Sequence, residues 1–179
     1  WYMPSDPKVS CEAIEDHHVA LLRELKTAVT IPVSMKLSPF FSSLPHFVQQ
    51  LDAAGAAGIS MFNRFFQPDI DLDTLSVVDR VQLSSSADTL LAMRLIAILR
   101  GSTTLSLAAT GGVHTAADAL KMLLAGADVV HMASALLKRG PQALSQVLQG
   151  MTDWLAEREY TSVAQMKGSM SQQNSPNPS

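Results

Sequence analysis

Two short apolar runs that end in small residues and lead into helices constrain the fold of this chain most strongly. One run ends at Ala109-Thr110-Gly111-Gly112-Val113, and the next ends at His131-Met132-Ala133-Ser134. Small residues at strand ends let backbone N–H groups approach a ligand closely, and a helix N-terminus adds a partial positive charge. Two such ends on consecutive parallel strands predict a phosphate site, which (β/α)₈ barrels build after their seventh and eighth strands.

The remainder of the chain shows the same alternation of short apolar strands and helices. The pattern predicts strands at 33–37, 58–62, 105–109 and 128–132. It predicts helices at 12–29, between Ser43 and Gly55, at 86–100, between Thr115 and Gly126, at 134–138 and at 141–157. Segment 66–85 is rich in Asp, Pro and Ser and shows little regular pattern. Strands alternating with helices predict parallel βα units of an α/β fold, and four strands are half of a (β/α)₈ TIM barrel.

The length of the chain is that of a partial barrel. Its 179 residues are fewer than the roughly 250 of a whole barrel, so we expect an N-terminal portion to precede Trp1. We expect residues 1–166 to form the C-terminal half of the barrel and the polar residues 167–179 to form a flexible tail. Half of a barrel has two unpaired edges and an exposed apolar interior face, so we expect the chain alone to self-associate.

Composition argues against several classes of partner. The net charge of −3 gives no electrostatic footprint for nucleic acid or an anionic membrane surface. No apolar run approaches the roughly 20 residues that span a bilayer. The single cysteine, Cys11, excludes an internal disulfide and a Cys-based metal cage and is compatible with a cytoplasmic location. No two histidines have the context of a metal site, so we expect no metal.

Polar residues near the strand ends are the candidates for chemistry. Lys36 lies in an otherwise apolar strand, where a barrel side chain points at the active-site mouth. A buried lysine is costly unless it meets an anion or an acceptor, and a structural ion pair is the alternative. Asn63 closes the next strand, and its amide can bond a ring carbonyl or ring nitrogen, although Asn is also a common turn residue. Arg64 is either a clamp for a carboxylate or a solvated surface side chain. We expect the side chain of His114 to be exposed.

Four segments of the sequence resemble those of a known family. IPVSMKLSP, GISMFNRFF, LAATGGVHTAADALKMLLAGADVVHMASALL and GPQALSQVLQGM, in this order and spacing, closely resemble the C-terminal half of dihydroorotate dehydrogenases. The resemblance runs from Tyr2 to about Ser169. It implies a (β/α)₈ barrel that carries FMN and oxidises dihydroorotate to orotate in pyrimidine biosynthesis. By the same resemblance, the four strands are the fifth to the eighth.

The resemblance implies a role for several residues. Lys36 matches the family's lysine at the pyrimidine edge of the flavin, where a fixed positive charge stabilises the anionic reduced form. Asn63 matches the asparagine that hydrogen-bonds the substrate. The backbone segments around the FMN phosphate are matched by Gly111, Gly112, Ala133 and Ser134.

The chain departs from the family pattern at the catalytic base. The family places a Cys or Ser in the loop after the fourth strand to remove the proton, and Met3 stands at that position. A thioether has no dissociable proton and cannot be a general base, which leaves Ser5 as the catalytic candidate. Ser84 and Ser85 fall near flavin-contacting glycines of the family, and the insertion 65–71 would reshape the substrate pocket.

Three hypotheses therefore stand. The first is an FMN-dependent oxidoreductase that acts on a CH–CH group of a small-molecule substrate. The identity of this substrate stays open, because Met3 replaces the usual Cys or Ser base. The second is a non-flavin TIM-barrel enzyme that grips a phosphorylated substrate and uses Lys36 as a catalytic amine. The third is an inactive, truncated flavin-binding remnant, and we expect this portion alone to be inactive. The electron acceptor and the oligomeric state stay open, although barrels of this kind often form homodimers.

Overall fold

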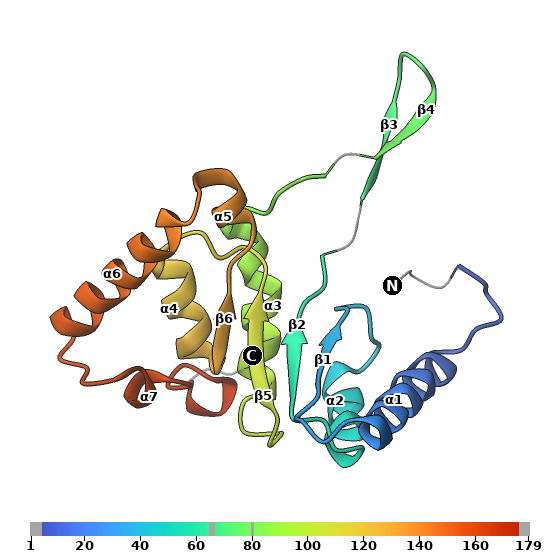
Figure 1. Cartoon of the computed structure of the whole chain (residues 1–179), viewed down its shortest axis with the longest axis horizontal. Helices are drawn as coiled ribbons and strands as arrows, with labels where there is room; N and C mark the ends of the chain where they lie inside the picture. Colours follow the sequence, from blue (N-terminus) through green and yellow to red (C-terminus); the bar gives the residue numbers. More distant parts are fainter. Residues whose placement is uncertain (1–4, 65–66, 80, 176–179) are drawn as a thin grey trace.

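The chain is built around a four-stranded parallel sheet. The computed structural model describes residues 5–64, 67–79 and 81–175, and the strand order is β1-β2-β5-β6 (Figure 1). The strands are β1 (Ser34–Leu37), β2 (Gly58–Met61), β5 (Ser106–Thr110) and β6 (Val129–His131). Every neighbouring pair in this sheet is parallel. The four predicted strands are therefore confirmed.

Helices connect these strands. α1 (Cys11–Ala28) precedes β1, and α2 (Leu44–Ala53) joins β1 to β2. A 3₁₀ helix, η1 (Ser86–Asp88), leads into α3 (Thr89–Leu99) and then β5, and α4 (Ala116–Ala125) joins β5 to β6. The remaining helices are α5 (Ser134–Arg139), α6 (Gln142–Glu157), α7 (Val163–Met166) and the 3₁₀ helix η2 (Gln172–Asn174). This α/β arrangement with a parallel sheet is consistent with part of a TIM barrel. None of the described helices combines the length and apolarity needed to cross a membrane.

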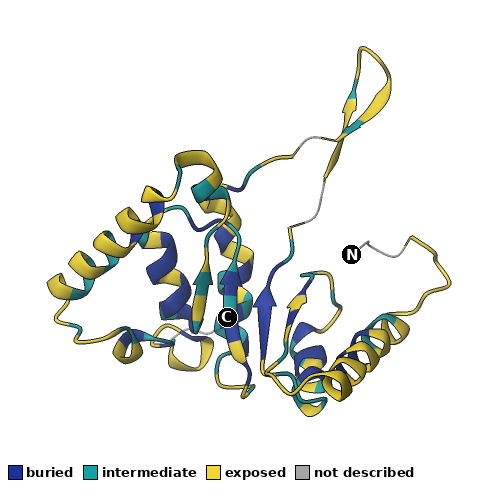
Figure 2. Cartoon of the chain, in the orientation of Figure 1, coloured by how far each residue is buried: buried dark blue, intermediate teal, exposed yellow. Residues whose placement is uncertain are grey.

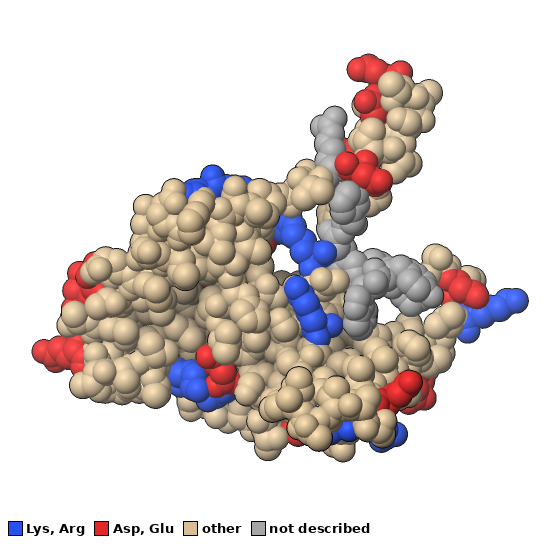
Figure 3. All heavy atoms as spheres, in the orientation of Figure 1, with Lys and Arg blue, Asp and Glu red and all other residues tan. Residues whose placement is uncertain are grey.

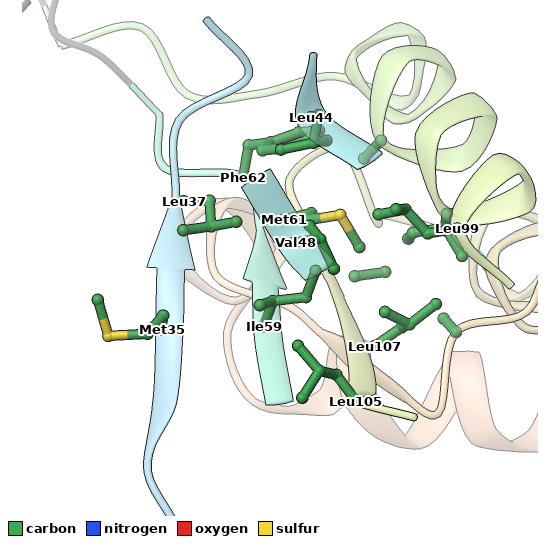
Figure 4. Close-up of a cluster of buried hydrophobic side chains, with 14 of the residues drawn as sticks. Met35, Leu37, Leu44, Val48, Ile59, Met61, Phe62, Leu99, Leu105 and Leu107 are labelled. Atoms are coloured by element: carbon green, nitrogen blue, oxygen red, sulfur yellow. The ribbon is translucent and has the colours of Figure 1, made fainter. Parts of the chain in front are cut away.

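The apolar core lies between the helices and one face of the sheet (Figure 2). Successive side chains of a strand point to opposite faces, so every second residue faces the helices. The buried residues on this face include Met35, Leu37, Ile59, Met61, Leu107 and Ala109. In Figure 4 the Met61 side chain extends from β2 towards Leu99 of α3. Burial of these side chains against the helices holds the sheet in place.

The opposite face of the sheet carries mainly small and polar side chains. The register pairs Lys36 with Ser60, and Ser60 with Ala108. By alternation this face holds Ser34, Lys36, Ser60, Ser106, Ala108 and Thr110. Lys36 is exposed, and Val129 at the β6 edge is an exposed apolar residue. The expectation of an apolar interior face is therefore wrong for β1, β2 and β5, because their large apolar residues point towards the helices.

Segment 66–85 contains an antiparallel hairpin that the sequence pattern did not predict. Strand β3 (Pro68–Asp71) pairs with β4 (Ser76–Asp79), and the hairpin projects from the body of the chain (Figure 1). Asp71 Oδ1 accepts hydrogen bonds from the N–H groups of Asp73 (2.9 Å) and Thr74 (3.0 Å), which forms the turn. The strands are short and contain Asp, Ser and Pro, so their β-pattern is weak.

Residues 167–175, expected to belong to a flexible tail, pack against the end of α4 and the start of β6. Lys167 Nζ lies 2.6 Å from Asp128 Oδ1. The N–H of Gly168 donates to the Leu123 carbonyl at 3.0 Å, and the N–H of Met170 donates to the Leu124 carbonyl at 2.9 Å. These contacts give the first part of the predicted tail a defined position. The boundary at residue 166 stays a prediction.

Candidate functional site

The carboxyl ends of the four parallel strands lie at one edge of the sheet (Figure 1). They lead into Ser38-Pro39 after β1, Phe62-Asn63 after β2, Gly111-Gly112 after β5, and Met132-Ala133-Ser134 after β6. Ligands of parallel α/β folds bind at this edge, because the strands bring the loops that follow them together. The structure therefore places the predicted substrate and phosphate residues on the same edge.

Ser84 joins the loops that follow β5 and β6. Its N–H donates to the Ser134 hydroxyl at 3.0 Å, and its own hydroxyl accepts from the N–H of Gly112 at 3.3 Å. The same hydroxyl lies 3.1 Å from Nε2 of His114, and the Ser84 carbonyl accepts from Lys138 Nζ at 2.9 Å. Ser84 is only 3% exposed, and these bonds satisfy its buried polar groups. We call this set of residues the Ser84 junction.

Gly111 and Gly112 have positive φ angles, +97° and +77°, but very different surroundings. A Cβ at Gly111 would meet no heavy atom within 4 Å, so the backbone there borders open space. A Cβ at Gly112 would lie 2.5 Å from the backbone nitrogen of Thr89. Gly112 is therefore required for close packing against the start of α3, whereas Gly111 leaves room that a ligand can occupy.

Lys36 extends from the open face of the sheet. The ion pairs within the described ranges are Arg64–Asp88, Arg100–Asp128 and Lys167–Asp128, and none of them includes Lys36. The alternative of a structural ion pair for Lys36 thus finds no support in this part of the chain. Figure 3 shows Lys and Arg side chains beside a hollow near the base of the hairpin, with acidic side chains on the hairpin above it.

Arg64 follows β2 and contacts Gln82 and Asp88, the last residue of η1. Its Nε donates to the Gln82 carbonyl and its Nη1 to Asp88 Oδ1, both at 3.1 Å. Asp88 Oδ2 accepts from the N–H of Ser85 at 2.7 Å. This backbone hydrogen bond, together with Arg64, lowers the pKa of Asp88 although burial opposes it. In this structure Arg64 therefore holds a carboxylate of its own chain.

The remaining predicted site residues are Asn63, for substrate binding, and Ser5, for proton removal. Asn63 is half-buried, and its N–H donates to the Leu37 carbonyl at 2.7 Å, which continues the pairing of β1 with β2. Ser5 is exposed, and within the described ranges no hydrogen bond joins it to Asn63 or Lys36. Met3 lies outside the described residues, as does the pair 65–66 of the predicted insertion.

Sequence reasoning underestimated His114. We expected an exposed side chain, whereas His114 is half-buried and reaches Ser84. Its N–H donates at 3.0 Å to Asp118 Oδ2, which also accepts from the N–H and the hydroxyl of Thr115 and from the hydroxyl of Ser86. Burial raises the pKa of Asp118, but these hydrogen bonds outweigh it and the net shift is downward. Thr115 and Asp118 form a capping box at the start of α4, and this capping box fixes the backbone next to His114.

Comparison with known proteins gives the family. The family model described as Dihydroorotate dehydrogenase matches residues 7–155, which is most of the chain. The chain belongs to the dihydroorotate dehydrogenase family. Within the described ranges, no group of three or more His, Cys, Asp or Glu is placed to hold a metal ion.

Several curated dihydroorotate dehydrogenases are similar to the chain. "Dihydroorotate dehydrogenase A (fumarate)" of Lactiplantibacillus plantarum is 33% identical over 147 residues, which cover 80% of this chain and 48% of that protein. "Dihydroorotate dehydrogenase B (NAD(+)), catalytic subunit" of Listeria monocytogenes is 35% identical over 113 residues, 62% of this chain and 37% of that protein. The same subunit of Shouchella clausii is 28% identical over 151 residues, 83% and 49%. The chain thus spans less than half the length of these relatives.

Dihydroorotate dehydrogenases are FMN-dependent flavoproteins, and the strand-end loops fit the phosphate of FMN. Gly111 borders open space, so a phosphate could approach its backbone closely. Ser134 begins α5, whose first N–H groups point out of the helix. Lys36 adds a positive charge on the open face of the same sheet. These residues would hold the cofactor.

Proposed function

We propose that the protein containing this chain is an FMN-dependent oxidoreductase that acts on a CH–CH bond of dihydroorotate or a related small molecule. In this proposal the four strands are the fifth to the eighth of a (β/α)₈ barrel. The observation that carries it is the Ser84 junction, which brings the loops after β5 and β6 together beside the open space at Gly111. The family match supports flavin chemistry at this edge and does not favour the non-flavin alternative.

The phosphate of FMN would lie at the ends of β5 and β6. Gly111 offers its backbone without a side chain in the way, and Ala133 and Ser134 form the start of α5. A helix start favours an anion through its free N–H groups and its dipole. Gly112 contributes by packing against Thr89, which fixes the course of the loop.

The reacting atoms would lie over the open face of the sheet, nearer to β1 and β2. When bound, FMN supplies the hydride acceptor. Lys36 places a fixed positive charge on this face, and Asn63 offers a donor and an acceptor that can orient a planar substrate. Ser5 is the candidate that accepts the substrate proton, since Met3 cannot do so. A cytoplasmic location and a homodimer stay predictions from the sequence.

Anaerobic titration with dihydroorotate tests this function. The protein that contains this chain is loaded with FMN, and the visible absorbance of the flavin is followed. We expect dihydroorotate to bleach the flavin band, and Ser5→Ala to slow the bleaching by at least about a hundredfold, as for loss of a general base. A flavin band that persists at saturating dihydroorotate would show that the substrate is another molecule. Absence of flavin binding by the folded protein would refute the proposal as a whole.

A further inference from the structure

The Ser84 junction unites three segments that are far apart in the sequence. Ser84 precedes η1, Gly112 follows β5, and Ser134 begins α5. Ser84 links the two strand-end loops by two hydrogen bonds. Its N–H donates to the Ser134 hydroxyl, and its own hydroxyl accepts from the Gly112 N–H. A second link is a hydrogen bond from the Arg139 guanidinium to the His114 carbonyl. The loops are thus held by side chains as well as by the sheet.

We propose that Ser84 is a positioning residue that holds the loops after β5 and β6 at the spacing that the FMN phosphate requires. This inference rests on the proposed function. Ser84 itself is not placed to bind the cofactor, because its N–H, hydroxyl and carbonyl are all engaged within the protein. It acts through Gly112 and Ser134, which flank the predicted phosphate position.

The burial of Ser84 makes its hydroxyl hard to replace. The residue is 3% exposed, and the Gly112 N–H that it accepts is buried as well. Loss of the hydroxyl removes its contact with His114 Nε2 and leaves the Gly112 N–H without its acceptor, and an unsatisfied buried donor is costly. The bonds made by the Ser84 backbone to Ser134 and Lys138 do not depend on the side chain. Ser84→Ala therefore releases the loop after β5 while it keeps the link to α5.

Comparison of FMN with riboflavin tests this role, because riboflavin is the same ligand without the phosphate. For Ser84→Ala in the full protein, we expect the dissociation constant for FMN to rise about tenfold, as for loss of the hydrogen bond to the buried Gly112 N–H. The riboflavin constant should change less than about twofold, since its ring contacts are intact. A merely structural role would weaken both flavins alike. Equal losses for both flavins, or none for FMN, would overturn the inference.

Ser171→Ala is the matched control. Ser171 is a fully buried serine in the C-terminal segment, and its hydroxyl has no hydrogen-bond partner within the described residues. We expect this variant to bind both flavins like the wild type. If Ser84→Ala does not fold, Ser84→Cys replaces the hydroxyl with a thiol, which is a weaker acceptor for the Gly112 N–H. The same loss of preference for FMN over riboflavin is then expected, and an unchanged preference would overturn the inference.

Amide hydrogen exchange gives a readout that needs no flavin. In Ser84→Ala the Gly112 amide should exchange about tenfold faster, because its acceptor is gone, whereas the α4 amides should keep their rates. An unchanged Gly112 rate would overturn the role of Ser84 whatever the protein binds. A wild-type protein that binds no FMN would instead refute the proposed function, and the exchange rates would still decide whether Ser84 holds the loop.

Discussion

Alanine substitutions at Gly111 and Gly112 distinguish the packing role of Gly112 from the ligand-binding role assigned to Gly111. Both residues have positive φ, which costs a non-glycine residue about 1–3 kcal/mol. At Gly111 this is the whole cost, because the new methyl group would meet no heavy atom within 4 Å. At Gly112 the methyl carbon would lie 2.5 Å from the backbone nitrogen of Thr89, and overpacking of this kind costs about 1–3 kcal/mol more.

Urea denaturation of Gly111→Ala and Gly112→Ala measures this difference. We expect the free energy of unfolding to fall by about 1–3 kcal/mol more for Gly112→Ala than for Gly111→Ala. Flavin binding should show what the methyl group at Gly111 does, because it fills the space assigned to the phosphate. Gly111→Ala is expected to raise the FMN dissociation constant at least about tenfold and to leave that of riboflavin nearly unchanged. Equal unfolding free energies for the two variants, or full FMN affinity in Gly111→Ala, would refute the reasoning.

Three further variants test other parts of the structure. Lys36→Ala should change the free energy of unfolding by less than about 0.5 kcal/mol, because the side chain is exposed, yet it should weaken FMN binding; unchanged affinity would remove Lys36 from the site. Asp128→Asn loses its ion pairs, including that with Lys167, and should lower the urea-derived free energy of unfolding by about 2–3 kcal/mol; a loss below about 0.5 kcal/mol would mean that these bonds hardly contribute. Because the pKa of Asp118 is lowered in the folded protein, the ionised carboxylate stabilises the folded state. This contribution is complete above the ordinary pKa of Asp and is lost as the pH falls through the folded-state pKa. The stability difference between wild type and Asp118→Asn should therefore shrink on acidification, and a difference independent of pH would contradict the assignment.

The sheet could be predicted because its signals are local. The apolar run 105–109, for example, is followed by Gly111-Gly112 and then by a helical pattern whose N-terminus Thr115 caps. The hairpin of β3 and β4 was missed because its short strands contain few residues with high β-propensity. Its turn, with Asp71 accepting two backbone hydrogen bonds, was the local signal that pointed to it.

The candidate site was predictable only in its strand-end residues. The glycines and Ser134 lie directly after apolar runs, so their place in the sequence indicates the edge of the sheet. Ser84 is separated in the sequence from Gly112 by 28 positions and from Ser134 by 50, and no local sequence pattern predicts contacts between residues so far apart in the chain. The different surroundings of Gly111 and Gly112 also depend on how α3 packs against the loop, which emerges only when the elements are assembled.

A crystal structure of the protein with FMN tests the central claim most directly. The account predicts that the phosphate oxygens lie within hydrogen-bond distance of the backbone N–H groups of Gly111 and Ser134. It also predicts that the flavin ring lies over the open face of the sheet, with Lys36 beside it. A phosphate bound away from the ends of β5 and β6, or a flavin on another face of the protein, would contradict the account.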